Sequence, residues 1–336
     1  MRRSSGKSTS LTALGVLAAV LVFAGTAANV ATAKPSHAAV AKAQIKIGFV
    51  NLGNSIPYAV EVQKGVVAAA KKAGVQVVTC DSALSVTKAI SCVQAFKSEG
   101  VQGIAEYQYD QQAAPRVCKA GPNVPVIAVD ILQPPCQKVF VGDDNFTAGK
   151  VSGVLLGQYA KTHFSCNVDA LFSVNSPVNS GVIAREKGWE AAFKSYCPKV
   201  PIVKVTPTTY TTDATITPFT DTLSRFPSAH HIMVAAVNDD TAIGAVRAAT
   251  AAGRLGDIYV SGQGADTTAY PYICQTTPFK NWLGDANYNP QSYGSLIVPA
   301  LVKLINGQKV PKQLIVKTLP LTKANISKEF PNACHK

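Results

Sequence analysis

V-P-V-I-A-V-D at residues 124–130, followed by K-V-F-V-G-D-D-N-F-T-A-G-K at residues 138–150, is the stretch that decides the fold of this chain. The first apolar run ends abruptly at Asp130, and the second ends in Gly-Asp-Asp-Asn and leads directly into a helical pattern. Carboxylates that follow buried strands mark the edge of an α/β sheet at which small ligands bind. We therefore expect a ligand contact at Asp130 and a crossing to a second lobe at Asp144.

Outward from this stretch, apolar strands alternate with helices of ten or more residues, which predicts parallel β-α-β units. The alternation begins with a strand at Ile45–Val50 and a helix at Pro57–Ala73. It restarts with a strand at Val168–Val174 and a helix at Ser180–Tyr196, and it runs on to an apolar helix at Pro290–Ile305. The sequence therefore predicts an α/β protein with two doubly wound parallel-sheet lobes and a cleft between them.

The first residues have the pattern of a secretory signal peptide, which we assign to residues 1–33. A basic start precedes the apolar stretch Leu11–Ala24, and Ala31-Thr32-Ala33 forms a small-x-small cleavage site. The apolar run is too short for a membrane anchor. Because the first cysteine is Cys80, we expect no lipid anchor either. The sequence thus predicts an exported protein, periplasmic or extracellular.

The composition excludes disorder, since 47% of the 336 residues are apolar and only 15% are charged. The net charge is +13, and the predicted signal peptide accounts for three of these positive charges. Lysine and arginine are scattered singly among polar segments, without an aromatic-rich basic motif. We therefore expect a solvated basic surface and no nucleic-acid site.

Eight cysteines in an exported protein imply disulfides. There is no C-x-x-C pair and no histidine at zinc-finger spacing, so no metal site is expected. Four cysteines fall in each predicted lobe, and each lobe alone allows three connectivities. Sequential pairing is preferred, because it keeps every bridge inside one lobe: Cys80–Cys92, Cys118–Cys136, Cys166–Cys197 and Cys274–Cys334.

Several motifs resemble the sugar-type (type I) periplasmic solute-binding proteins of ABC importers, the family that includes ribose- and galactose-binding proteins. V-G-D-D-N-F-T-A-G at residues 141–149 is similar to the family's V-G-x-D-N-x-x-A-G, and R-E-K-G-W at 185–189 to R-x-x-G-aromatic. N-D-D-T-A-I-G-A-V-R-A-A-T-A-A-G at 238–253 follows a third family pattern. Together the matches extend over residues 45–325 in the family's order.

The resemblance implies a monomeric, non-catalytic receptor that closes by a hinge on a monosaccharide or related polar solute. The receptor would deliver its solute to an ABC permease in the membrane, without a cofactor or metal. The sequence contains no G-x-S-x-G motif, no H-E-x-x-H motif and no phosphate-cradling loop, so no catalytic motif indicates an enzyme. Two alternatives stay open, namely a sensing role with a chemoreceptor or sensor kinase, and a non-sugar polar ligand.

In the family the chain crosses between lobes three times, which here implies crossings near residues 143–145, 286–290 and 316–319. The N-terminal lobe would then comprise residues 44–143 plus 288–316. The C-terminal lobe would comprise residues 144–287 plus 317–336.

The candidate ligand contacts are polar or aromatic side chains at the predicted cleft edge. Carboxylates, amides and the arginine fork suit hydroxyl groups, and aromatic rings suit the C–H faces of a sugar. The candidates are Tyr58, Tyr107, Asp130, Asp144, Arg185, Tyr210, Asn238, Asp266, Asn287 and Tyr288.

Five of the candidates also have an ordinary structural interpretation. Asp130 could be a loop carboxylate, Arg185 a surface charge, and Asn238 or Asp266 a helix cap. Asp144 could hold the hinge, cap its helix or touch the ligand.

The sequence also departs from the family pattern at positions that usually contact sugar. Ile56 stands where the family often has asparagine, Ile131 where it often has arginine, and Tyr288 where it often has glutamine. The identity of the solute therefore does not follow from the resemblance.

Overall fold

A computed structural model describes residues 44–334 of the chain, and the predicted signal peptide lies outside these residues. The described part contains two six-stranded sheets, with strand orders β11-β5-β4-β3-β1-β2 and β12-β10-β9-β8-β6-β7. All pairings are parallel except that of β10 with β12. The predicted α/β fold with two doubly wound parallel sheets is therefore confirmed.

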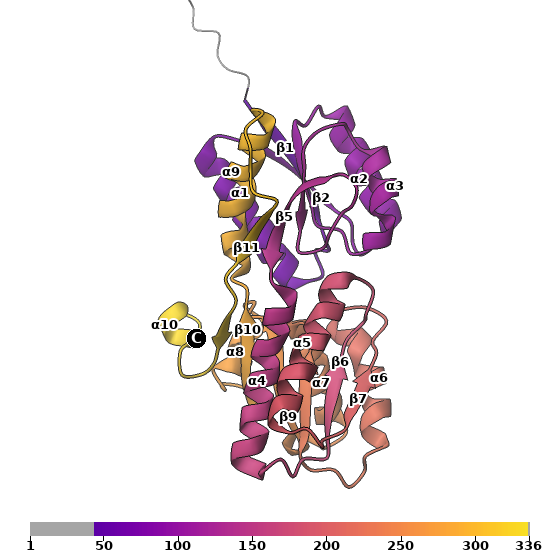
Figure 1. The fold of residues 1–336 in the computed structure, drawn as a ribbon, viewed down its shortest axis with the longest axis vertical. Coiled ribbons are helices and arrows are strands. Elements are labelled where there is room, and N and C mark those ends of the chain that lie inside the picture. Colours follow the sequence, from indigo (N-terminus) through magenta and orange to yellow (C-terminus); the bar gives the residue numbers. More distant parts are fainter. Residues whose placement is uncertain (1–43, 335–336) are drawn as a thin grey trace, which may run out of the picture. The chain divides into compact units, whose positions relative to one another are not determined.

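We call the first sheet and its helices the first lobe. In Figure 1, α1 and α9 lie together on one side of this sheet, and α2 and α3 lie on the other. Its strands are β1 (Lys46–Asn51), β2 (Gln76–Asp81), β3 (Gly103–Glu106), β4 (Val126–Val129), β5 (Gln137–Asp143) and β11 (Gln313–Val316). Its helices are α1 (Pro57–Ala73), α2 (Val86–Ser98), α3 (Ala114–Ala120) and α9 (Tyr293–Ile305), with short 3₁₀ turns at Gln111–Ala113 (η1) and Pro290–Ser292 (η3).

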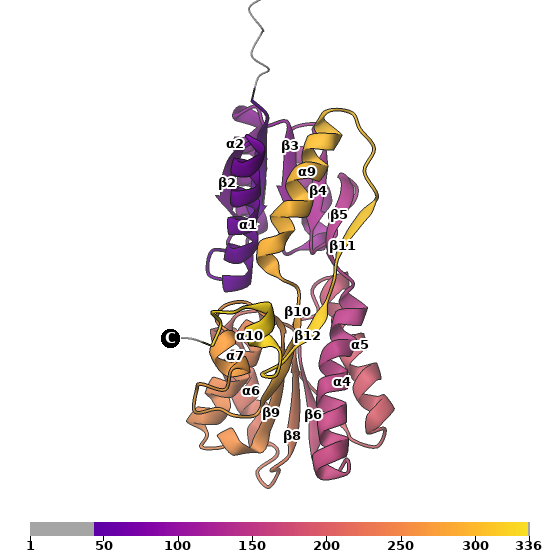
Figure 2. The same ribbon diagram turned by 90° about the vertical axis from the view of Figure 1, so that its left-hand side faces the viewer.

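The second sheet and its helices form the second lobe, in which α4 and α5 cover one face and α6 and α7 the other (Figure 2). Its strands are β6 (Ala170–Val174), β7 (Ile202–Val205), β8 (Ile232–Ala236), β9 (Ile258–Gly264), β10 (Trp282–Asn287) and β12 (Leu319–Leu321). Its helices are α4 (Asn145–Phe164), α5 (Ser180–Tyr196), α6 (Thr212–Ser224), α7 (Asp239–Ala251), α8 (Tyr270–Ile273) and α10 (Ile326–Glu329), with a 3₁₀ turn at Leu255–Asp257 (η2).

The chain passes between the two sheets three times. It leaves the first sheet after β5 and enters α4, whose N-cap is Asp144. It returns after β10, and it crosses once more between β11 and β12. The chain leaves β5, β10 and β11 at neighbouring points. Three short segments of backbone therefore join the lobes side by side (Figures 1 and 2).

Helix ends follow the chemistry of their terminal residues. Proline at the first position of α1 supplies a helical φ, and Gly74 ends the helix in the left-handed conformation at φ 67°. In α4 and α5, glycines allow backbone-to-backbone contact, since a Cβ on Gly149 would lie 1.9 Å from the carbonyl oxygen of Arg185. The glycines of α4 therefore serve close helix packing.

The four disulfides follow the preferred sequential pairing. They join Cys80 to Cys92, Cys118 to Cys136, Cys166 to Cys197 and Cys274 to Cys334. Each pair has Cα atoms 5.5–5.9 Å apart. Each bridge stays inside one lobe, so none of them restrains the lobes relative to each other.

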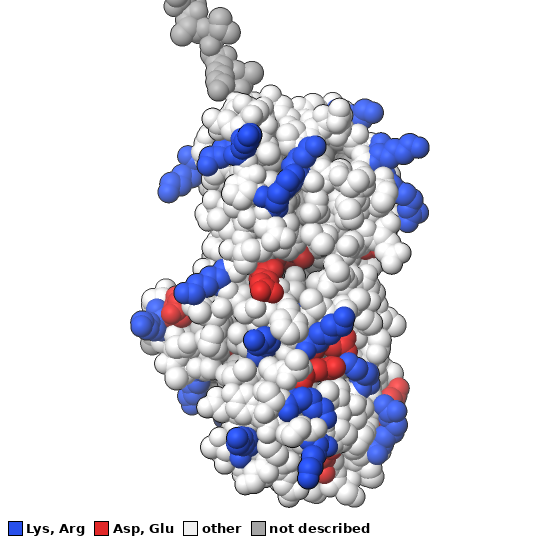
Figure 3. Space-filling view, viewed as in Figure 1, with Lys and Arg blue, Asp and Glu red and all other residues white. Residues whose placement is uncertain are grey.

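The surface agrees with the scattered charge pattern of the sequence. On the face shown in Figure 3, lysine and arginine side chains stand singly or in small groups among uncharged residues. No helix within residues 44–334 has both the length and the apolar character needed to cross a bilayer.

Candidate solute-binding site

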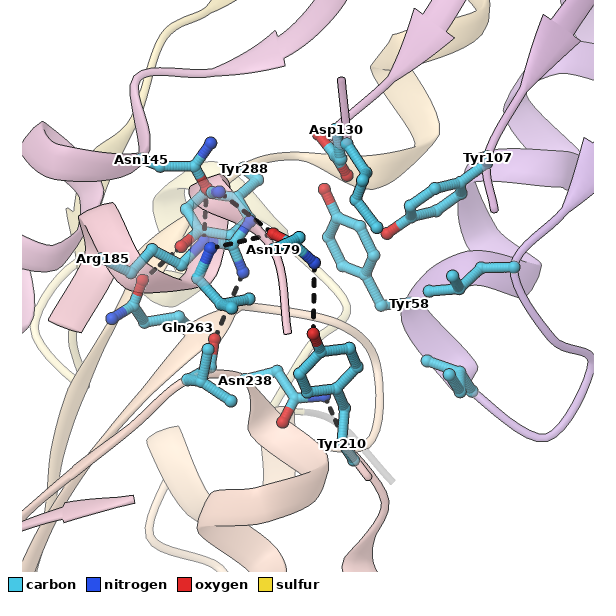
Figure 4. A pocket seen from close by; sticks show the side chains of 16 residues that line it. Tyr58, Tyr107, Asp130, Asn145, Asn179, Arg185, Tyr210, Asn238, Gln263 and Tyr288 are labelled. Atoms are coloured by element: carbon cyan, nitrogen blue, oxygen red, sulfur yellow. Dashed lines mark hydrogen bonds between the residues drawn. The ribbon is translucent and has the colours of Figure 1, made fainter. Parts of the chain in front are cut away.

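A cavity lies between the two lobes, at the carboxyl ends of the strands of both sheets. Its wall in the first lobe includes Tyr58, Tyr107 and Asp130, and its wall in the second lobe includes Arg185 and Asn238. Figure 4 shows their polar groups converging on one space. The space that the centres of water molecules can occupy in this cavity is about 50 Å³. This is room for a few waters or one small solute.

Asp130 is the carboxylate that the first lobe presents to the cavity. It follows β4 at φ 55° and is only 5% exposed. Its Oδ1 accepts a hydrogen bond of 2.7 Å from the hydroxyl of Tyr293, which in turn accepts one of 3.0 Å from the hydroxyl of Tyr58. Within residues 44–334, its Oδ2 has no hydrogen-bond partner. A buried carboxylate oxygen without a donor is costly, so a bound hydroxyl would satisfy it.

Arg185 is the cation of the cavity, and it reaches in from the second turn of α5. Its Nε donates to Asn145 Oδ1 at 2.6 Å, and one Nη donates to the carbonyl oxygen of Val237 at 3.2 Å. The other Nη lies 3.5 Å from Asp143 Oδ2. The guanidinium also stacks over the ring of Tyr288 at 4.9 Å. These contacts fix its plane while leaving some N–H groups for a solute.

Asp143 is buried below Arg185 and is 1% exposed. Burial raises the pKa of its carboxyl to about 7, with Arg185 opposing and Asp130 reinforcing the shift. Burial likewise raises the pKa of Asp130, against the opposing effects of Arg185 and of the hydrogen bond from the Tyr293 hydroxyl. One arginine thus balances two carboxyl groups, both of which burial drives toward protonation.

The second lobe adds amides that are partly used for helix capping. Asn179 Oδ1 caps α5 by accepting from the backbone of Gly181 at 3.0 Å, and its Nδ2 donates to the hydroxyl of Tyr210 at 3.1 Å. Asn238 Oδ1 caps α7, and its Nδ2 donates to the carbonyl oxygen of Tyr210 at 2.9 Å. Both asparagines line the cavity while they hold its wall in place.

Gln263 and Tyr288 close the hinge side of the cavity. The hydroxyl of Tyr288 donates to Gln263 Oε1, whereas Gln263 Nε2 has no partner although the residue is only 1% exposed. Among the described residues, the cavity therefore offers Asp130 Oδ2 as an unpartnered acceptor and Gln263 Nε2 as an unpartnered donor group, beside the remaining N–H groups of Arg185.

Residues 47–309 match the family model of the periplasmic binding protein domain. The chain belongs to this family. A comparison with curated proteins found no match.

Two solved structures illustrate the fold that this periplasmic binding protein shares with its relatives. An ABC transporter periplasmic solute-binding protein from Actinobacillus succinogenes 130z with bound D-allose is 22% identical, with a TM-score of 0.73 over 85% of this chain and 100% of that chain. An ABC transporter solute-binding protein from Mycobacterium smegmatis with bound glycerol is also 22% identical, with a TM-score of 0.75 over 85% of this chain and 96% of that chain.

The structure of this periplasmic binding protein brings seven of the ten candidate residues to the cavity wall. Asp130 and Arg185 face it from different lobes, and Asn238 both lines it and caps α7, so the two interpretations of Asn238 coexist. The seven are Tyr58, Tyr107, Asp130, Arg185, Tyr210, Asn238 and Tyr288.

The other three candidates lie outside this cavity for identifiable reasons. Asp144 is exposed and caps α4, accepting from the backbone and hydroxyl of Thr147 at 3.2 and 2.7 Å. Asp266 is turned into the second lobe, where its Oδ1 accepts from the backbone and hydroxyl of Thr268. Asn287 folds back on the hinge backbone, where its Oδ1 accepts from the N–H of Asn289 at 2.8 Å.

Sequence reasoning missed Asn145, Asn179 and Gln263 as lining residues. A signal existed for the first two, because each is a polar residue next to a helix start that faces the predicted cleft. Gln263 gave no such signal, since it lies inside β9 and only the path of the strand brings it to the hinge.

Proposed function

We propose that this protein is an exported solute receptor that binds a small, uncharged polyhydroxylated molecule between its lobes and delivers it to an ABC permease. The solute class would be a monosaccharide or a related polyol. The observation that supports this proposal most directly is that Asp130 from the first lobe and Arg185 from the second face the same cavity. A solute that contacts both stabilises the closed form, because its binding energy depends on closure.

The charge balance of the cavity supports an uncharged solute. The positive charge of Arg185 is offset by Asp143 beneath it, and burial raises the pKa of both nearby carboxyl groups. A carboxylate or phosphate ligand would meet these acidic groups, and a cation would meet the guanidinium. Hydroxyl groups can both donate to Asp130 Oδ2 and accept from Gln263 Nε2, so they suit the site as it stands.

The two structural neighbours support the solute class, since one carries D-allose and the other glycerol. The proposal also includes lobes of residues 44–143 plus 288–316 and 144–287 plus 317–336. Removal of the N-terminal residues during export belongs to the same proposal.

The test is a thermal-shift screen of the exported protein with D-allose, other hexoses and pentoses, glycerol and myo-inositol, alongside amino acids. A solute at 100 times its Kd should stabilise the fold by about 2.7 kcal/mol. Arg185→Ala should abolish the shift, while Lys187→Ala, which changes an exposed residue of the same helix, should leave it intact. A response restricted to amino acids, or an equal response in Arg185→Ala, would overturn the proposal.

A further inference from the structure

Within the described residues, two polar contacts join the lobes beside the cavity in addition to the ion pair of Arg185 with Asp143. In the first, Glu61 Oε1 accepts from the backbone N–H of Thr267 at 2.9 Å and from its hydroxyl at 2.6 Å. In the second, Gln111 Oε1 accepts from the backbone N–H of Ser180 at 3.2 Å and from its hydroxyl at 2.8 Å. Each acceptor belongs to the first lobe and each donor residue to the second.

These four residues do not line the cavity, but they are neighbours of residues that do. Glu61 lies one turn after Tyr58 on α1, and Ser180 stands between Asn179 and Gly181. Their contacts therefore form only when the lobes are close together, and they involve no residue that lines the cavity. They occur on separate elements of both lobes, so the two contacts are independent observations of one closed arrangement.

The Glu61 contact is the stronger of the two. Glu61 is only 4% exposed, and no lysine or arginine within residues 44–334 forms a salt bridge with it. Its hydrogen-bond donors are the two groups of Thr267. A hydrogen bond to a charged group changes an equilibrium constant by about tenfold or more. The exposed contact of Gln111 with Ser180 joins neutral groups and should contribute a few-fold.

We infer that Glu61 and Gln111 are positioning residues that stabilise the closed form and thereby set the affinity for solute, without touching the solute. The inference rests on the proposed function in so far as closure serves binding. The apparent Kd equals the intrinsic Kd divided by the closed fraction of the free protein. A residue that raises the closed fraction therefore tightens binding of every solute by the same factor.

The test measures amide hydrogen exchange in the solute-free protein. The acceptor of one contact is substituted, and the exchange rate of the amide in the other contact is measured. Glu61→Ala should accelerate exchange of the Ser180 amide about tenfold, because that amide is released only when the lobes open. Glu61→Gln keeps an Oε1 acceptor but loses the charge, so it should accelerate this exchange only a few-fold, less than Glu61→Ala does. Reciprocally, Gln111→Ala should accelerate exchange of the Thr267 amide a few-fold. Amides inside β8 should keep their protection in all variants, which excludes loss of the lobe itself.

The inference is overturned if each substitution affects only the amide that lost its own acceptor. It is also overturned if Glu61→Gln accelerates exchange at Ser180 as much as Glu61→Ala does. If Glu61→Ala fails to fold, Gln111→Ala, at a half-buried position, decides by its effect on the Thr267 amide. No solute enters these measurements, so a failed solute screen would sink the proposed function and leave this result standing.

Discussion

The Glu106 carboxyl should make the stability of the first lobe depend on pH. Glu106 ends β3 on the sheet face toward α2 and α3, and it is 1% exposed. Its Oε1 has no hydrogen-bond partner, and its neighbours include Val93, Ile104 and Val117. Burial alone raises the pKa of this carboxyl from 4.5 to about 7.

The sign and size follow from that shift. The folded protein binds the Glu106 proton more tightly than the unfolded chain does. Below the unfolded pKa of 4.5 the carboxyl is therefore protonated in both states and costs no stability. As the pH rises from 4.5 to 7, the folded state loses stability, and above pH 7 the loss is complete. A shift of about 2.5 pKa units corresponds to about 3 kcal/mol.

The assay compares urea unfolding of wild type and Glu106→Gln from pH 4 to pH 8, followed by circular dichroism. The amide does not titrate, so the variant should gain about 3 kcal/mol on the wild type between pH 4.5 and 8. Other carboxyl groups cancel in the difference. A flat difference for Glu106→Gln would refute the reasoning, because it would mean that the carboxyl is solvated or paired.

Two further substitutions test how the cavity wall is held. Tyr293→Phe removes the hydroxyl that donates to Asp130 Oδ1, and we expect about tenfold weaker solute binding by calorimetry with an unchanged fold; unchanged affinity would contradict the role. Gly149→Ala places a methyl group 1.9 Å from the Arg185 carbonyl oxygen, which should cost about 2–3 kcal/mol in unfolding experiments. Gly256→Ala, whose Cβ would meet no atom within 4 Å, is its control, and equal effects at both positions would refute the packing argument.

The sequence predicted long elements well, since their signals are local. The expected helices at residues 57–73 and 180–196 have the observed bounds, because apolar spacing and the residues that flank each helix specify them. The strands β11 and β12 gave no usable periodicity, as they contain four and three residues. Their place in the two sheets depends on pairing with β5 and β10, which are distant in sequence.

For the site, the sequence indicated which strand ends carry polar residues but not the direction of each side chain. Asp144 and Asp143 are adjacent, yet one caps α4 in solvent and the other is buried beneath Arg185. What distinguishes them is that β5 ends at Asp143, whereas Asp144 already belongs to the start of α4. Tyr293 was missed for a similar reason, because its link to Asp130 spans 163 positions of the chain.

The departures from the family pattern have a shared structural consequence. Ile56 and Ile131 both line the cavity from the first lobe, where the resemblance implied asparagine and arginine. Their side chains leave Asp130 as the charged group of that wall, among tyrosine rings and aliphatic carbons. The amides of Asn179, Asn238 and Gln263 all come from the opposite lobe. The two lobes therefore offer unequal numbers of polar groups to a solute. Because Ile56 and Ile131 depart from the family pattern and Arg185 does not, we expect these two isoleucines to decide which solute fits.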